Sequence, residues 1–187
     1  MSPGTYAGEF DREAGWTMVH LDDAVQKWFL ECGWTCQHST KVPDTIPVSH
    51  PAHEILRTFG GIKLLENDCD DDDPYEKFEF RLIPSPDSAI QAWSRRLRSQ
   101  LVGIANEDGC HAELYVDGTG RCFSNSLVHG AFAFAGDSLG DTLLGVLNHR
   151  RYRPLLRPWQ NEISMYGEWI VRGDPRVYDY GAKWYWF

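Results

Sequence analysis

Residues 50–64 read HPAHEILRTFGGIKL, an amphipathic run that is joined to a second apolar run by two glycines. Apolar side chains recur every three or four residues from Ala52 to Phe59, which is the spacing of one helix face. Gly60 is suited to the left-handed position at which helices commonly end, and Gly61 lets the chain reverse closely against the helix. Residues 62–65 are then predicted to enter a strand directly. The join therefore indicates a helix packed against the strand that follows it.

The segment before this join predicts another helix and a long connection. Apolar residues from Leu21 to Cys32 follow the helical spacing, and Gly33 is a natural stop. Prolines interrupt the sequence between residues 38 and 51, so this connection should be extended or looped. Ser49 is available to cap the helix that begins after it.

The segment after the join alternates strands with helices. Residues 78–82 alternate apolar and charged side chains as a half-buried strand does, and the apolar positions from Ile90 to Leu101 predict a helix. Residues 111–123 read as a hairpin that turns at Asp117-Gly118, and 138–147 begin with a capping-box pattern. Helices interleaved with short, hairpin-connected strands favour an α+β fold.

Length, composition and charge limit the class of protein. The 187 residues suit one domain, and 42% hydrophobic with 24% charged residues is typical of a globular chain. No signal-like segment begins the chain, so we expect a cytoplasmic protein without a membrane span. Residues 1–149 carry 23 acidic and 11 basic side chains, a net of −12, which disfavours direct nucleic-acid binding and favours a basic protein partner.

The last part of the chain differs in composition. Residues 150–187 have a net charge of +3, and nine of the 29 residues from Trp159 to Phe187 are aromatic. Because this many aromatic rings are rarely left exposed to water, we expect this extension to pack back on the domain or to cover a partner.

The acidic segment 67–76, NDCDDDDPYE, invites a calcium hypothesis, because Asp68, Asp70, Asp72 and Glu79 fall at positions 1, 3, 5 and 12 of an EF-hand-like loop. Asp73 stands where the sharp turn of that loop needs glycine, and Pro74 follows. A solvated loop or a partner-facing acidic patch accounts for the sequence better, and no metal site is predicted.

Histidines and cysteines offer two further alternatives. His38, His50 and His53 lie near Cys32 and Cys36 in the sequence, but their spacing does not match a standard zinc finger. The five cysteines, at positions 32, 36, 69, 110 and 122, include no CxxC pair and fit reduced thiols better than disulfides.

A small cysteine hydrolase remains an alternative, with Cys36 or Cys122 as the nucleophile and a distant histidine as the base. Adjacent strand residues point to opposite faces, so His111 should not serve Cys110. Hydrolase, nucleotide-binding and metalloprotease motifs are all absent from the sequence, and no cofactor or catalytic residue is predicted.

An ordered set of motifs carries a family resemblance. LECGWT (30–35), AHEILRTFGGIKL (52–64), FEFRL (78–82), GCHAELYVDGTGRCF (109–123) and AGDSLGDTLLGVL (135–147) together resemble the SUKH superfamily, most closely its SUKH-3 group. Cys32 stands where the family tripeptide usually has alanine, and the acidic segment and the aromatic extension are also departures. The resemblance implies a SUKH-like domain at 18–150, with a curved, mainly antiparallel sheet packed with helices, and an extension at 151–187.

The resemblance also implies an immunity protein that neutralises a cognate polymorphic toxin, commonly a nuclease or deaminase. It transfers no catalytic residues. Because nuclease surfaces that grip phosphates are basic, an acidic patch can mimic those phosphates. The candidate toxin-facing residues are Asp68, Asp70, Asp71, Asp72, Asp73, Glu76 and Glu79. A regulatory or scaffold module of the same superfamily is the alternative.

Overall fold

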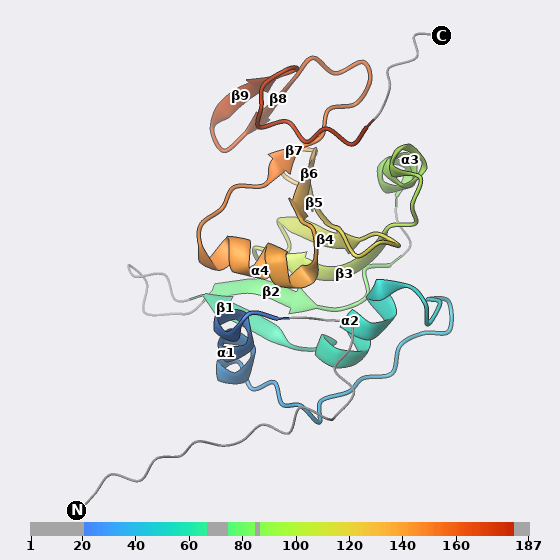
Figure 1. Cartoon of the computed structure of the whole chain (residues 1–187), viewed down its shortest axis with the longest axis vertical. Helices are drawn as coiled ribbons and strands as arrows, with labels where there is room; N and C mark the ends of the chain where they lie inside the picture. The colour runs from blue at the N-terminus through green and yellow to red at the C-terminus, as the bar shows by residue number, and fades with distance from the viewer. Residues whose placement is uncertain (1–20, 67–74, 85–86, 182–187) are drawn as a thin grey trace, which may run out of the picture.

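The computed structural model describes residues 21–66, 75–84 and 87–181, which form four helices and nine strands (Figure 1). The helices are α1 (Asp23–Glu31), α2 (Pro51–Phe59), α3 (Ser88–Leu97) and α4 (Leu139–Leu147). The strands are β1 (Lys63–Glu66), β2 (Tyr75–Phe80), β3 (Val102–Glu107), β4 (Ala112–Val116), β5 (Cys122–Ser126), β6 (Ala131–Gly136), β7 (Arg153–Pro154), β8 (Glu162–Met165) and β9 (Glu168–Val171).

Strands β1 to β7 form one antiparallel sheet in which every strand pairs with its neighbours in the sequence, and β8 pairs with β9 in a separate hairpin. Helices precede the first strand and interrupt the series twice, after β2 and after β6, which confirms the predicted α+β fold. Within these residues, no helix is long and apolar enough to cross a membrane.

The two faces of the sheet are covered by different helices. Leu114 and Val116 of β4 belong to a core that contains buried residues of α1, α2 and α4. Tyr115, which lies between them, and its β5 partner Phe123 belong to a second core with α3. Figure 1 shows α3 apart from the other three helices. The period-two alternation of strand side chains thus builds two hydrophobic layers on one sheet.

The first core is centred on aromatic rings from α1, α2 and β2. Phe59 of α2 stacks on Phe29 of α1 with ring centroids 4.3 Å apart, and Phe80 of β2 lies 5.8 Å from Phe59. All three side chains are at most 1% exposed. Each such burial is worth about 1.5–3 kcal/mol, so these rings hold both helices on the sheet.

The start of α2 differs from the prediction at one residue. The helix is capped by His50 and not by Ser49: His50 Nδ1 accepts a hydrogen bond from the Ala52 backbone N–H at 3.1 Å. His50 Nε2 lies 3.2 Å from the Gln100 carbonyl oxygen, which fits a ring that carries its proton on Nε2. His50 is 7% exposed, so a tertiary contact selects the cap here.

The two glycines after α2 have the reverse of the predicted roles. Gly60 has φ −53°, whereas Gly61 has φ +84° and is the left-handed residue. A Cβ atom on Gly60 would lie 2.5 Å from both the Leu56 carbonyl oxygen and Thr40 Oγ1. Gly60 is therefore required for space and Gly61 for backbone conformation.

The other local predictions are confirmed with small shifts. The α1 and α4 helices form as expected, and Ser138 Oγ accepts from the Asp141 N–H at 3.1 Å at the start of α4. The β4–β5 hairpin also forms as expected. The α3 helix ends before Leu101, because Arg98 adopts a left-handed conformation with φ +53°. Leu101 is nevertheless buried in the core beneath α3.

Residues after α4 add to the sheet and its second face. Strand β7 pairs with β6, and Tyr178 stacks on Phe134 of β6 with ring centroids 4.1 Å apart. The inner side of the β8–β9 hairpin, including Ile163 and Ile170, packs on alanines of β6. Trp159 and Trp169 are 68% and 67% exposed, so these residues leave two large rings in solvent.

Candidate functional site

Strand β2 places Glu79 on the side of the sheet away from the buried rings. Phe78 and Phe80 are fully buried, and Glu79 lies between them with its side chain partly exposed. Glu76 reaches the same surface because the register between β1 and β2 shifts at Leu64/Leu65. A β-bulge re-aims side chains in this way.

Lys63 of β1 holds the two carboxylates together. Its Nζ atom lies 2.6 Å from Glu76 Oε2 and 3.8 Å from Glu79 Oε1. The hydrogen bond to Glu76 raises the pKa of Lys63 above its ordinary value. Glu79 also lies 3.7 Å from Arg81 Nη1 and accepts a hydrogen bond from Asn106 Nδ2 at 3.0 Å. Both carboxylates are therefore already paired with basic side chains.

The remaining candidate residues, Asp68, Asp70, Asp71, Asp72 and Asp73, lie outside the described residues. In the sequence they fall between Glu66, the last residue of β1, and Tyr75, the first residue of β2, and these two residues pair with each other. The structure therefore brings Glu76 and Glu79 together.

A second charged cluster lies beside the same end of β2. Lys77 Nζ is 2.8 Å from Asp108 Oδ1 and 3.1 Å from the Tyr75 hydroxyl oxygen, and this hydroxyl donates to Asp108. Burial alone would lower the pKa of Lys77, but its contacts with Asp108 and Tyr75 outweigh burial and raise that pKa. These contacts fix the β3–β4 turn against β2.

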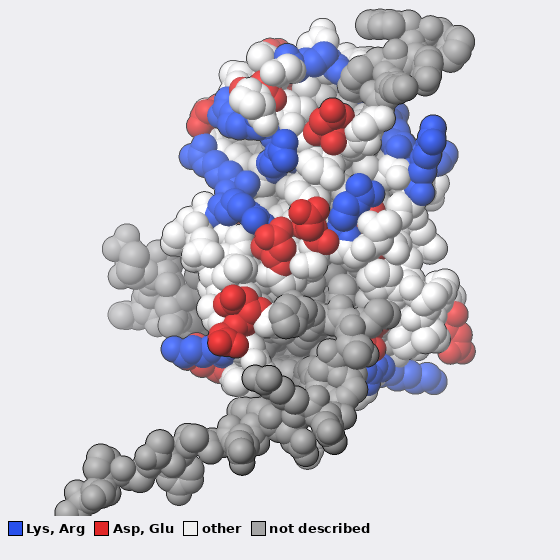
Figure 2. Space-filling model, in the orientation of Figure 1, with Lys and Arg blue, Asp and Glu red and all other residues white. Residues whose placement is uncertain are grey.

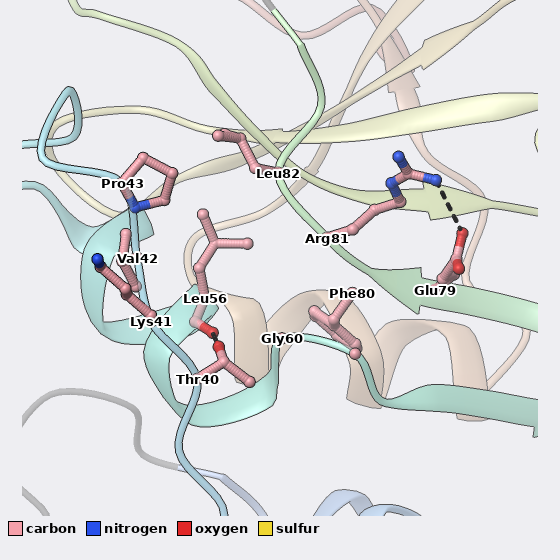
Figure 3. A pocket seen from close by; sticks show the side chains of 11 residues that line it. Thr40, Lys41, Val42, Pro43, Leu56, Gly60, Glu79, Phe80, Arg81 and Leu82 are labelled. Atoms are coloured by element: carbon pink, nitrogen blue, oxygen red, sulfur yellow. Dashed lines mark hydrogen bonds and ion pairs between the residues drawn. The ribbon is translucent and has the colours of Figure 1, made fainter.

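A pocket of about 390 Å³ adjoins Glu79 at the other end of β2 (Figure 3). The segment from Thr40 to Pro43 forms one wall, and Phe80, Arg81 and Leu82 form the other. Figure 3 shows Leu56 between the two walls. The floor is apolar, whereas the rim carries Lys41, Glu79 and Arg81. This arrangement can take an apolar group and contact charged groups around it.

In the comparison with protein-family models, the chain matches the SUKH-3 immunity protein model over residues 11–148. The chain belongs to the SUKH-3 immunity protein family. Comparisons with curated proteins and with solved structures found no match. The family match covers most of the chain and confirms the resemblance carried by the ordered motifs.

Two of the three histidines considered for zinc, His50 and His38, serve structural roles in this SUKH-3 protein. His50 caps α2, and His38 Nε2 lies 2.9 Å from the Gly60 carbonyl oxygen. No group of three potential metal ligands occurs among the residues that the structure describes. Most of the calcium ligand set lies in the undescribed connection, and Glu79 is held in ion pairs.

The thiols considered for hydrolase chemistry are poorly placed. Cys122 is fully buried, and burial raises the pKa of its thiol to about 12, which opposes formation of the nucleophilic thiolate. Cys110 and His111 lie in the β3–β4 turn and not on a strand as expected, and Cys110 has φ +72°. Cys36 is exposed.

Sequence reasoning missed a buried polar cluster in the SUKH-3 sheet. Glu107 of β3 is 3% exposed and accepts hydrogen bonds from Ser124 Oγ and the Tyr152 hydroxyl, both at 2.6 Å. Burial raises the pKa of Glu107, and these two hydrogen bonds oppose that shift only in part. The alternation that places Ala105 inward also places Glu107 inward, but Tyr152 comes from 45 residues away. No local pattern indicates that partner.

Proposed function

We propose that this SUKH-3 protein binds a cognate polymorphic toxin, a nuclease or deaminase, and neutralises it by covering the toxin's active surface without catalysing a reaction. The family match over residues 11–148 carries the proposal, because immunity is the role of the family. The surface formed by Asp68, Asp70, Asp71, Asp72, Asp73, Glu76 and Glu79, here called the acidic surface, is the proposed contact.

Charge supports this choice of surface. The chain has a net charge of −9, and Figure 2 shows acidic side chains spread from top to bottom of one face, with most of the basic ones in its upper, C-terminal half. A basic toxin surface would be attracted to the body from a distance and would meet no bulk repulsion there. Glu76 and Glu79 keep their carboxylates oriented through Lys63, so little side-chain entropy is lost when they are contacted.

We also propose that residues 18–150 are the SUKH-like domain, that 151–187 is an extension packed on it, and that the protein acts in the cytoplasm. The stacking of Tyr178 on Phe134 and the pairing of β7 with β6 support the packing. Four free cysteines in the described part of the chain are consistent with a reducing compartment. A regulatory or scaffold module would share this fold and differ in its partner.

The first experiment is a pull-down of the tagged full chain from native lysate at low and at moderate salt, with mass spectrometry of the retained proteins. Retention of a large protein that ends in a basic, nuclease-like or deaminase-like domain is expected, and moderate salt should weaken it. Retention of housekeeping proteins alone would favour the regulatory module.

The acidic surface is then tested by replacing Asp70, Asp71, Asp72 and Asp73 with Asn. We expect the affinity for the recovered toxin domain to fall about tenfold or more and its salt dependence to become shallower. The matched control removes four carboxylates elsewhere, through Asp23→Asn, Glu31→Gln, Asp44→Asn and Glu162→Gln, all of them exposed. Equal losses in both variants would mean that net charge acts, and not this surface.

A further inference from the structure

The extended chain that continues β2 past its end at Phe80 has a vacant edge position at Leu82. The Phe80 N–H donates to the Ile62 carbonyl oxygen on the β1 side, whereas the Arg81 and Ile83 N–H groups donate to Ile104 and Gly103 on the β3 side. Because backbone groups alternate along an extended strand, the N–H and C=O of Leu82 point to the β1 side.

Strand β1 does not reach this position. Its first residue is Lys63, and Gly61 already donates its N–H to the Phe80 carbonyl oxygen as the chain turns away into α2. Within the described residues, the backbone groups of Leu82 have no hydrogen-bond partner. An open donor and acceptor on a sheet edge are a template for pairing with another extended chain.

The vacant edge lies in a groove. Leu82 lines the pocket of about 390 Å³ described above and also a second pocket of about 440 Å³, which extends past Ile83 toward α3. The opposite wall is formed along both pockets by the segment from Thr40 to Ile46. The groove thus has room for side chains on both sides of Leu82.

The opposite wall is held in place by α2. Thr40 donates its N–H to the Arg57 carbonyl oxygen at 2.8 Å and its hydroxyl to the Leu56 carbonyl oxygen at 2.7 Å (Figure 3). The absence of a side chain at Gly60 permits this approach. These two hydrogen bonds satisfy carbonyl groups in the last turn of α2 and fix the segment that begins at Thr40 to the end of that helix. The groove is therefore formed before any ligand binds.

We propose that this groove binds an extended segment of the toxin, which pairs with Leu82 as an added strand and inserts an apolar side chain between Pro43 and Leu82. This inference rests on the proposed function for the source of the segment. Glu79 lies in the pocket and in the acidic surface, so one toxin can contact both. Main-chain pairing supplies affinity in such complexes, and the pockets supply specificity.

The test uses a displayed library of random peptides about ten residues long, panned against the full chain and against Leu82→Pro. Proline removes the N–H of Leu82, which bonds to nothing in the described chain, together with a partly buried side chain that packs on the first core. The side-chain loss is shared with Leu82→Ala, so the two variants should have similar thermal stability. Peptides selected on the wild type are expected to share an apolar residue and to bind Leu82→Pro about tenfold more weakly. Leu82→Ala, which keeps the N–H, is the matched control and should lose less.

A second measurement on the unaltered protein covers the case in which Leu82→Pro unfolds. Amide hydrogen exchange at Leu82 should be fast in the free chain and slow when a selected peptide is bound. Peptides that protect other amides and leave Leu82 unprotected would overturn the inference, as would a library that yields no binder. If peptides protect Leu82 but no toxin is recovered from the lysate, the groove stands and the proposed function fails. If a toxin binds and leaves Leu82 unprotected, only the groove inference fails.

Discussion

The two edges of the seven-stranded sheet are covered in different ways. At β1, α1 supplies the cover: Trp28 Nε1 donates to the Leu65 carbonyl oxygen at 2.8 Å, and Cys32 Sγ lies 3.5 Å from the Leu65 nitrogen. At β7, the chain itself continues the edge, because the Tyr178 N–H donates to the Pro154 carbonyl oxygen at 2.9 Å.

The difference lies in how far each cover extends. The β7 edge has only two residues, and both receive contacts from Val177 and Tyr178. The α1 cover serves β1, but the hydrogen-bonded chain continues beyond β1 to Leu82, where no helix side chain of the described residues bonds to its backbone. Open edges invite pairing, so a sheet that covers both residues of β7 and leaves Leu82 open is suited to selective strand addition there.

The largest expected loss of stability comes from removing the α1 side chain that covers the β1 edge. Trp28→Ala removes the hydrogen bond to Leu65 and a ring that is 8% exposed and lies edge-on to Phe78. The free energy of unfolding should fall by about 3–5 kcal/mol, measured by urea denaturation. Trp169→Ala, at a ring 67% exposed, should change it by less than about 0.5 kcal/mol. Similar losses in the two variants would contradict the assigned role of Trp28.

A smaller effect is expected at the β7 edge. Tyr178→Ala removes the ring stacked on Phe134 but keeps the backbone bond to Pro154. We expect a loss of about 2 kcal/mol in the free energy of unfolding. Tyr178→Phe, which keeps the ring, should retain most of it. A Tyr178→Ala protein as stable as the wild type would show that residues 177–181 contribute little to closing this edge.

The smallest expected change in stability concerns Glu107, which accepts a hydrogen bond from Tyr152 in the segment just before β7. Folding raises the pKa of Glu107, so its contribution to stability is present below the unfolded-state pKa, near 4.5, and is lost as pH rises through the folded-state value. Relative to Glu107→Gln, the wild type should therefore become less stable as pH is raised from about 4 to 8.

Thermal unfolding across this pH range measures the difference between wild type and Glu107→Gln. Glu162→Gln, at an exposed carboxylate on β8, serves as the control and should follow the wild type at every pH. A constant difference between Glu107→Gln and wild type would mean that Glu107 does not titrate differently in the folded state.

The elements of the fold were predictable because their signals are local. Apolar periodicity located α1 and α2, and alternation with an Asp-Gly turn located the β4–β5 hairpin. The roles of Gly60 and Gly61 were wrong because the decisive contact comes from Thr40, which no pattern around residue 60 indicates. The cap at His50 was missed for the same reason, since its ring also contacts Gln100.

The candidate site was predictable only in part. The sequence indicates that Glu76 and Glu79 are close to the acidic segment, and both lie on one surface. Their pairing with Lys63 depends on the bulge at Lys77 of β2, and the open position at Leu82 depends on where β1 leaves the sheet. Register and strand length are set by tertiary packing, so neither could be read from composition or spacing.

The strictly sequential order of the sheet also bears on how the chain folds. Each strand from β2 to β7 pairs with the strand before it in the sequence, and no interruption within the sheet contains more than one described helix. The entropy of loop closure is therefore small at every step, which favours rapid folding for a β-rich chain. During synthesis the sheet can grow strand by strand from β1, and the contact of Tyr178 with β6 can form only after residue 178 has emerged from the ribosome.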